Sequence, residues 1–135
     1  MSFALDTNAV IHLLNGKPTS VKEHFNHTIE SGELIFIPPF VDYEIMRGFY
    51  YSEQATKLAT YEKLRSLCPV GEMNSATWEC AARVYATLRR ANSQIGDGDI
   101  CISAYCIIND YVLVTQNTKH FENIEDLHIV NWAQS

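Results

Sequence analysis

Acidic residues in three separate parts of the chain have the types and positions to do chemistry on a phosphate group. Asp6 ends a short apolar run, Glu44 lies just after a second one, and Asp97 and Asp99 precede a third. Carboxylates gathered without a partner have raised pKa values and cost stability, so such a cluster makes physical sense mainly around a cation. Oxygen ligands suit Mg²⁺ or Mn²⁺, which polarises a phosphoryl oxygen and activates a water. Phosphodiester hydrolysis is the chemistry that this pattern favours.

Each of these acids also has a purely structural interpretation. Asp6 could cap the helix that follows it, and Asp97 could cap the helix in which Asp99 would lie in the first turn. Glu44 could form a surface ion pair with Arg47, three residues further along a helix. For Asp97 the sequence leaves the choice open. The apolar residues after Asp99 favour a position facing a cleft, and the place of Glu44 after a buried strand favours a functional role.

Apolar runs alternate with helical patterns and would position these acids. We expect strands near residues 2–5, 34–37, 111–115 and 127–130. Helices are expected over residues 9–14, 20–29, 40–49, 53–67, 75–88 and 100–108. Short apolar strands separated by helices predict a parallel sheet covered on both faces, with right-handed crossovers.

Three local patterns make more specific structural predictions. The spacing of Ser20 and Glu23 is that of a capping box, which would start the second helix. The run 34–37 is uniformly apolar and predicts a fully buried strand. In the helix after Asn74, the side chains expected to share a face are Trp78, Ala81, Ala82, Tyr85 and Leu88.

The carboxyl ends of parallel strands share one edge of a sheet, and this edge is where open α/β sheets bind ligands. It would receive Asp6 after the first strand and residues 115–117 after the third. Glu44 and Asp99, near the starts of two helices, would converge on the same cleft. We therefore expect the strand ending at Asp6 to be central in the sheet, beside the strand that ends at Thr115.

Length and composition indicate one globular domain, residues 1–135, with 47% hydrophobic and 19% charged residues. We expect a cytoplasmic protein without a membrane span or signal peptide. The four cysteines form no CxxC pair and are expected to be buried, reduced thiols rather than disulfides or a zinc site. The formal net charge of −6 argues against a broad basic surface for nucleic acid. It does not exclude a nuclease whose clustered acids bind divalent cations.

Other chemistries have weaker support in the sequence. His12 and His120 are expected to be packed or surface side chains rather than catalytic groups. GxxxxGK[ST] and GxGxxG motifs are absent, which argues against a nucleotide-binding loop, and the absence of GxSxG argues against a serine hydrolase.

The order and spacing of five motifs resemble the PIN-domain ribonucleases, and within them the VapC-type toxins of toxin–antitoxin pairs. The motifs span nearly the whole chain and are Leu5–Asn8, Glu44 with Gly48, Ile95–Ala104, Leu113–Phe121 and Leu127–Trp132. The resemblance implies a three-layer α/β/α sandwich with a mainly parallel sheet. It also implies a Mg²⁺- or Mn²⁺-dependent endoribonuclease in which Asp6, Glu44 and Asp99 hold the metal, and Asp97 matches an acid found in many members.

The sequence departs from the family pattern at Asn117, where a fourth aspartate is frequent, and this puts a second tightly bound metal in doubt. Asn117 is expected to orient a water or a carboxylate, with Thr115 as a hydrogen-bonding neighbour and Thr7 bonded to Asp6. Similar toxins form homodimers and are silenced by an antitoxin that covers the acidic cleft. An RNA substrate, a small antitoxin and a second copy of the chain are therefore the expected partners.

Two other functions fit parts of the pattern. The fold could serve as a binding module with little catalysis, which the amide at Asn117 would favour. A haloacid-dehalogenase-like phosphatase would also place an aspartate after the first strand, but that group needs a second aspartate two residues later, where this chain has Asn8.

Overall fold

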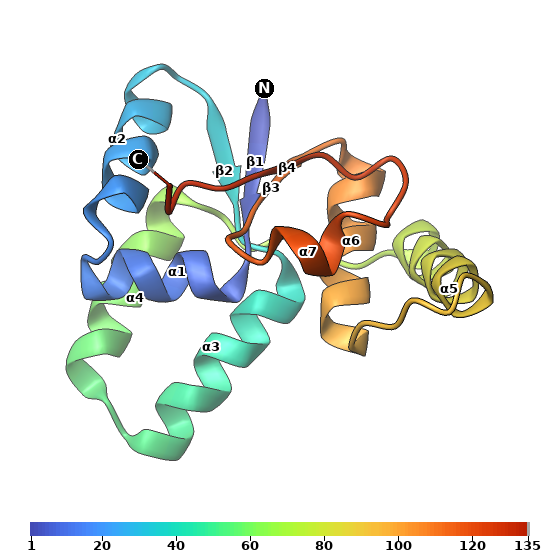
Figure 1. Ribbon diagram of the computed structural model, residues 1–135. Helices are drawn as coiled ribbons and strands as arrows, with labels where there is room; N and C mark the ends of the chain where they lie inside the picture. The colour runs from blue at the N-terminus through green and yellow to red at the C-terminus, as the bar shows by residue number, and fades with distance from the viewer. Residues whose placement is uncertain (135) are drawn as a thin grey trace.

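The computed structural model describes residues 1–134 as four strands and seven helices. In chain order the elements are β1 (Ser2–Leu5), α1 (Thr7–Asn15), α2 (Thr19–Glu30), β2 (Leu34–Phe36), α3 (Pro39–Ser52), α4 (Ala55–Leu67), α5 (Ser75–Arg90), α6 (Asp97–Asn109), β3 (Val112–Val114), α7 (Thr118–Phe121) and β4 (Ile129–Val130). Helices α1 and α2 lie on one side of the sheet, and α5 and α6 lie on the other (Figure 1). The predicted α/β sandwich is confirmed.

The four strands form one parallel sheet in the order β2-β1-β3-β4. Strand β1 is therefore central and pairs with β3, with Leu5 opposite Val114. After β1 the chain adds β2 next to one edge of β1, and later adds β3 next to the opposite edge. The direction of the strand order therefore reverses between β1 and β3. Crevices at the carboxyl ends of the strands form at such a switch point. The predicted placement of the first strand is confirmed.

The core lies between the sheet and its helices, and α6 is its most buried helix. The side chains from Ile102 to Cys106 are all buried, because α6 packs against both α5 and β3 and also contacts α3. A helix covered on several sides holds its first turn, which carries Asp97 and Asp99, in a fixed place relative to the sheet.

Strand β2 differs from the expectation of full burial. It lies at one edge of the sheet, and its Leu34 side chain is 59% exposed, although Ile35 is buried. The strand is extended by a single parallel bridge between Ile37 and Val70, in the short extended segment after α4. An apolar run therefore marked the strand correctly but did not reveal its position in the sheet.

Two predictions about helices were wrong in detail. Helix α2 begins at Thr19 after Pro18, and Pro18 supplies no side-chain cap, so Ser20 lies inside the first turn and does not form the predicted capping box. In α5, Asn74 does cap the helix through a 2.9 Å bond from the Thr77 amide. Its buried face, however, is formed by Thr77, Ala81 and Leu88. The residues wrongly assigned to that face are Trp78, Ala82 and Tyr85.

Helices α3 and α4 pack against each other as a hairpin. The buried Tyr61 of α4 donates a 2.7 Å hydrogen bond to Oδ1 of Asp42 in α3, and Arg65 lies 3.4 Å from the same oxygen. Asp42 also lies in the first turn of α3, as expected of an acid favoured by the helix dipole. This contact fixes α3, which carries Glu44.

Two further observations bear on the class of protein. Within residues 1–134, no helix is long and apolar enough to cross a membrane. All four cysteines are free thiols; Cys68 and Cys106 are buried as predicted, whereas Cys80 and Cys101 are partly exposed.

Candidate active site

Asp6 lies at the carboxyl end of the central strand and has a fixed position. Its amide donates a 3.1 Å hydrogen bond to the Val114 carbonyl, which joins it to the end of β3. Its Oδ1 accepts a 2.7 Å bond from the Ala9 amide and caps α1. The structural interpretation of Asp6 as a cap is therefore correct. It does not exclude a role in binding, because a carboxylate has further lone pairs to offer.

The environment of Asp6 disfavours its charge. The side chain is only 5% exposed, and burial raises its pKa from 3.8 to about 6. Hydrogen bonds from the Thr115 hydroxyl and the Ala9 amide lower the pKa in part, while the charges of Asp99 and Glu44 raise it further. These two acids therefore act on Asp6 electrostatically, although they come from α3 and α6. The predicted convergence of three carboxylates on one edge of the sheet agrees with this coupling.

Glu44 is held near the start of α1 by a neighbour of Asp6. The Thr7 hydroxyl donates a 2.6 Å hydrogen bond to Oε1 of Glu44, across 37 residues of sequence. Thr7 was expected to bond Asp6, and this prediction was wrong. Asp6 directly follows β1, whereas Thr7 is the first residue of α1 and bonds Glu44 of α3. The other oxygen, Oε2, lies 3.5 Å from a guanidinium nitrogen of Arg47, so the predicted surface ion pair also forms.

Asp99 lies in the first turn of α6 and has a neighbour that the sequence analysis set aside. Nδ1 of His120, in the short helix α7, lies 3.2 Å from Oδ2 of Asp99. Helix α7 follows β3 at the same edge of the sheet, which brings His120 to the acidic cluster. The usable signal was its position five residues after Thr115, because a segment that leaves a strand end stays close to that edge.

The remaining predicted residues lie at or beside this edge in different ways. Thr115 is buried. Its hydroxyl accepts a 3.0 Å hydrogen bond from the backbone N–H of Asn117 and also forms the hydrogen bond that lowers the pKa of Asp6. Asn117 is exposed and precedes α7 without capping it through its side chain. Asp97 is exposed, and its charge raises the pKa of Cys101, whereas the N-cap of α6 is Gly96. The cap interpretation of Asp97 is therefore wrong, and it does not contribute to the raised pKa of Asp6.

The sequence as a whole matches the PIN domain family over residues 3–127. This chain belongs to the PIN domain family. The resemblance noted above is confirmed, and the membership argues against the haloacid-dehalogenase-like alternative.

Several proteins similar to this PIN domain cover its whole length. Ribonuclease VapC1 of Haemophilus influenzae strain R2866 is 27% identical over 143 residues, which cover 99% of this chain and all of that protein. The tRNA(fMet)-specific endonuclease VapC of Shigella flexneri is 28% identical over 134 residues, 98% of this chain and 99% of that one. A chain in the crystal structure of Rickettsia felis VapBC2 bound to promoter DNA superposes with a TM-score of 0.90 at 22% identity, covering 98% and 99% of the two chains, which shows a shared fold.

The acidic residues of this PIN domain fit a hydrated divalent ion better than a closed metal cage. Within residues 1–134, no three acidic, histidine or cysteine side chains are grouped closely enough to hold one ion directly. Magnesium commonly binds through one or two carboxylates and keeps several waters. Asp6 with Asp99 or Glu44 would supply such a set. Burial, and to a smaller extent the charges of Asp99 and Glu44, raises the pKa of Asp6, and a bound cation would favour its ionised form.

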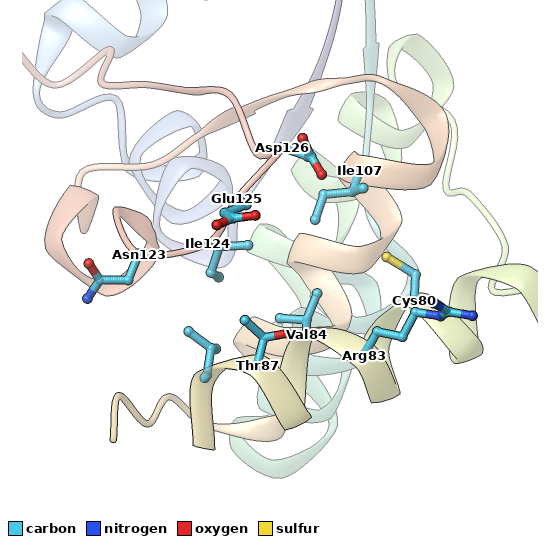
Figure 2. Close-up of a pocket in the computed structure, with 10 residues that line it drawn as sticks. Cys80, Arg83, Val84, Thr87, Ile107, Asn123, Ile124, Glu125 and Asp126 are labelled. Carbon is cyan, nitrogen blue, oxygen red and sulfur yellow. The ribbon is translucent and has the colours of Figure 1, made fainter. Parts of the chain in front are cut away.

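A separate hollow of about 200 Å³ is lined by other residues, and Figure 2 shows their side chains. It is formed by α5, α6 and the segment between α7 and β4, and side chains such as Val84, Ile107 and Ile124 give it an apolar wall. Its volume is below that of ordinary small-molecule sites. The predicted site residues are not among those that line it. The chemistry of this PIN domain is therefore better sought at the sheet edge.

Proposed function

We propose that this protein is a metal-dependent endoribonuclease that hydrolyses RNA phosphodiester bonds, with Mg²⁺ or Mn²⁺ as its cofactor. The observation that carries the proposal is the buried carboxylate of Asp6, at the switch point of a parallel sheet, coupled to Asp99 and Glu44. Membership of the PIN domain family and the ribonuclease and endonuclease names of full-length relatives support it. We place the activity in the cytoplasm, in keeping with the free thiols.

The chain's own residues prepare the site for an ion and a phosphate. Asp6, with a pKa of about 6, is mostly ionised at pH 7.5 and is held by its bonds to Ala9 and Thr115. Thr7 fixes Glu44, and His120 contacts Asp99, so each carboxylate has an orienting neighbour. A divalent ion bound among them would polarise a phosphoryl oxygen and activate a water.

The test is cleavage of RNA by the purified chain in Mg²⁺, with and without a chelator. We expect cleavage that the chelator abolishes, and a loss of about 100-fold or more in Asp6→Asn, which removes a charge but keeps the cap. Asp110→Asn is the matched control, because Asp110 is an exposed residue at the far end of α6. Cleavage that persists in chelator, or in Asp6→Asn, contradicts the proposal.

We further propose that the protein is the toxin of a type II toxin–antitoxin pair. A groove of about 270 Å³ runs between α1 and α3 and ends at the site, because Thr7 and Glu44 line it together with apolar side chains such as Ile11 and Phe49. An antitoxin segment in this groove would cover the acidic cluster, and a basic side chain would complement it. Solved VapBC complexes among the structural neighbours, such as VapBC from Salmonella typhimurium at 26% identity and a TM-score of 0.82, support this partner.

Co-expression with the product of an adjacent small open reading frame tests the partner. We expect the two chains to co-purify and the complex to lack ribonuclease activity. Ile11→Lys should weaken the complex without unfolding the protein, since Ile11 is 38% exposed. Isolation of a fully active, unbound chain in the presence of that product would argue against the toxin assignment. We also propose a homodimer, which sedimentation of the chain alone would test.

A second candidate function is a binding module with weak catalysis. Asn117 favours this candidate, because its exposed side-chain amide occupies a position where an acid would supply another metal ligand. The two candidates differ in metal binding, since a catalytic site requires Mn²⁺ to bind beside Asp6 and Asp99. Strong Mn²⁺ density there in a soaked crystal would count against the binding module.

A further inference from the structure

A cluster of aromatic and cationic side chains, two of them exposed and one half-buried, lies on α3 directly beside the acidic site. We call Phe40, Tyr43 and Arg47 the α3 aromatic cluster. The ring of Tyr43 is 5.5 Å from that of Phe40, and the guanidinium carbon of Arg47 lies 4.9 Å from the centre of the Tyr43 ring. Tyr43 is 56% exposed, so burial in the core does not account for its aromatic face.

The cluster joins the two helices that carry acids of the site. Arg47 contacts Glu44 at 3.5 Å, which places its guanidinium at the rim of the acidic cleft. At the other end Phe40 packs on the first turn of α6, where Gly98 precedes Asp99. A Cβ atom on Gly98 would lie 2.5 Å from the Phe40 ring, so only glycine allows this close approach. The α3 aromatic cluster therefore lies on the helix that carries Glu44 and packs against the first turn of the helix that carries Asp99.

Aromatic faces with an adjacent arginine suit an unpaired nucleotide. A base stacks on an aromatic ring, and a guanidinium binds phosphate with two parallel hydrogen bonds. In a chain with a formal net charge of −6, a cation beside the carboxylates would also reduce the repulsion of an approaching phosphate. Bases inside a duplex do not expose their faces in this way, so the ligand must be single-stranded.

We infer that the α3 aromatic cluster is a nucleotide-stacking site, in which Tyr43 stacks on an unpaired base of RNA and Arg47 contacts a phosphate beside it. The inference rests on the proposed ribonuclease function and adds to it the residues that position an unpaired nucleotide next to the bond that is cut. Tyr43 and Arg47 are positioning residues in this scheme, since the acids hold the metal.

The test measures binding and cleavage separately. Binding of a fluorescent single-stranded RNA 10-mer is measured by anisotropy in the Asp6→Asn background, which is not expected to cut it. Tyr43→Ala in that background should weaken binding by about fivefold to a hundredfold, the range found for loss of one stacked base. Tyr43→Phe keeps the ring and should restore binding, which a defect in folding or in the tyrosine hydroxyl would not allow.

The chain offers a matched control on α5. Tyr85 is 46% exposed and carries Arg89 over its ring at 5.6 Å, which is the same kind of pair on a helix that carries none of the three site acids Asp6, Glu44 and Asp99. Tyr85→Ala should leave RNA binding unchanged. Equal losses in Tyr43→Ala and Tyr85→Ala, or no loss in either, would overturn the inference.

An abasic substitution in the RNA identifies the stacked nucleotide. Removal of the base at one position of the 10-mer should weaken binding to the protein with Tyr43 by the same factor as Tyr43→Ala does. The abasic substitution and Tyr43→Ala together should weaken RNA binding by no more than either change alone. A fully paired duplex should bind equally weakly with or without Tyr43. If the losses from the abasic substitution and from Tyr43→Ala add at every position of the RNA, stacking is contradicted. Stacking is also contradicted if the only defect of the Tyr43→Ala protein is an altered oligomeric state.

Failure of the proposed function would look different. If the chain with native Asp6 does not cut RNA in Mg²⁺ but the anisotropy results hold, the stacking site stands and the ribonuclease proposal falls. If it cuts RNA and Tyr43→Ala binds and cuts like Tyr85→Ala, the ribonuclease proposal stands and the stacking site falls.

Discussion

At the scale of single residues, Asp6 occupies a position that disfavours its charged form. It is buried at the end of the central strand, beside two other acids, with a pKa of about 6. The same carboxylate caps α1. An asparagine would keep the cap and remove the charge, so this one substitution separates the structural role of Asp6 from its electrostatic role.

Asp6→Asn should therefore stabilise the metal-free protein at neutral pH. Because the folded pKa of Asp6 is raised above its ordinary 3.8, its stability contribution is complete below pH 3.8 and is lost as the pH rises through about 6. The loss is about 3 kcal/mol on the basis of this shift. Urea unfolding should show Asp6→Asn more stable than the native chain at pH 7.5, with the difference shrinking toward pH 4. Asp110→Asn should show no such pH dependence, and equal stability of both variants at pH 7.5 would refute the argument.

His120 was missed as a site residue because its type and neighbours alone are those of many surface histidines. Its contact with Asp99 depends on the packing of α7 at the sheet edge, which only its position shortly after the third strand indicated. Thr7 was misassigned for a related reason. Whether it faces Asp6 or Glu44 depends on how α1 meets α3, across 37 residues of sequence.

Loss of His120 should weaken metal binding more than folding. Partners that orient a ligand typically change metal affinity by about 10- to 100-fold. We expect His120→Ala to lower Mn²⁺ affinity by about 10-fold in calorimetric titration, with little change in the unfolding midpoint. His128→Ala, at an exposed position before β4, should have normal Mn²⁺ affinity. A normal affinity in His120→Ala would mean that Asp99 needs no support from the histidine.

At the scale of elements, the site depends on how α3 meets the start of α6. The contact relies on Gly98, which lets the Phe40 ring lie against the helix. Gly98→Ala should displace Phe40 and destabilise the protein by about 1–3 kcal/mol, as overpacking usually does. Gly48→Ala in α3 is the matched control, because a Cβ there meets open space and alanine favours a helix. Denaturant unfolding should rank the native chain between the two variants, and a Gly98→Ala protein as stable as Gly48→Ala would exclude a tight contact.

The errors in predicting elements have one physical origin. Hydrophobic periodicity identified β2 and α5, but it counted Leu34, Trp78 and Tyr85 as core residues when all three are exposed. Apolar type is a one-sided guide to burial, since large apolar side chains are also common on protein surfaces. The face of a helix that becomes buried is decided by its neighbours. For α5, that neighbour is mainly α6, which the sequence cannot place.

At the scale of the whole molecule, the central place of β1 beside β3 was the prediction that led to the candidate site. Apolar strands separated by helices require parallel pairing, and parallel pairing brings Asp6 and Thr115 to one edge. The sequence did not predict the hollow beside α5, because its walls come from segments between residues 80 and 126 that approach only in the folded state. Topology thus follows from local patterns more readily than cavities do.

The same topology makes the stability of the whole domain a readout of metal binding. An ion that binds only the folded protein stabilises it by about 2.7 kcal/mol at a hundred times its dissociation constant. We therefore expect Mn²⁺ or Mg²⁺ to raise the thermal midpoint at pH 7.5, and a chelator to reverse the shift. The shift should be smaller at pH 5, since Asp6 is largely protonated below its pKa of about 6. Asp6→Asn should lose most of it and Asp110→Asn none. An equal shift in the two variants would mean that the ion binds elsewhere, and the switch point between β1 and β3 would then lose its claim to be the active site.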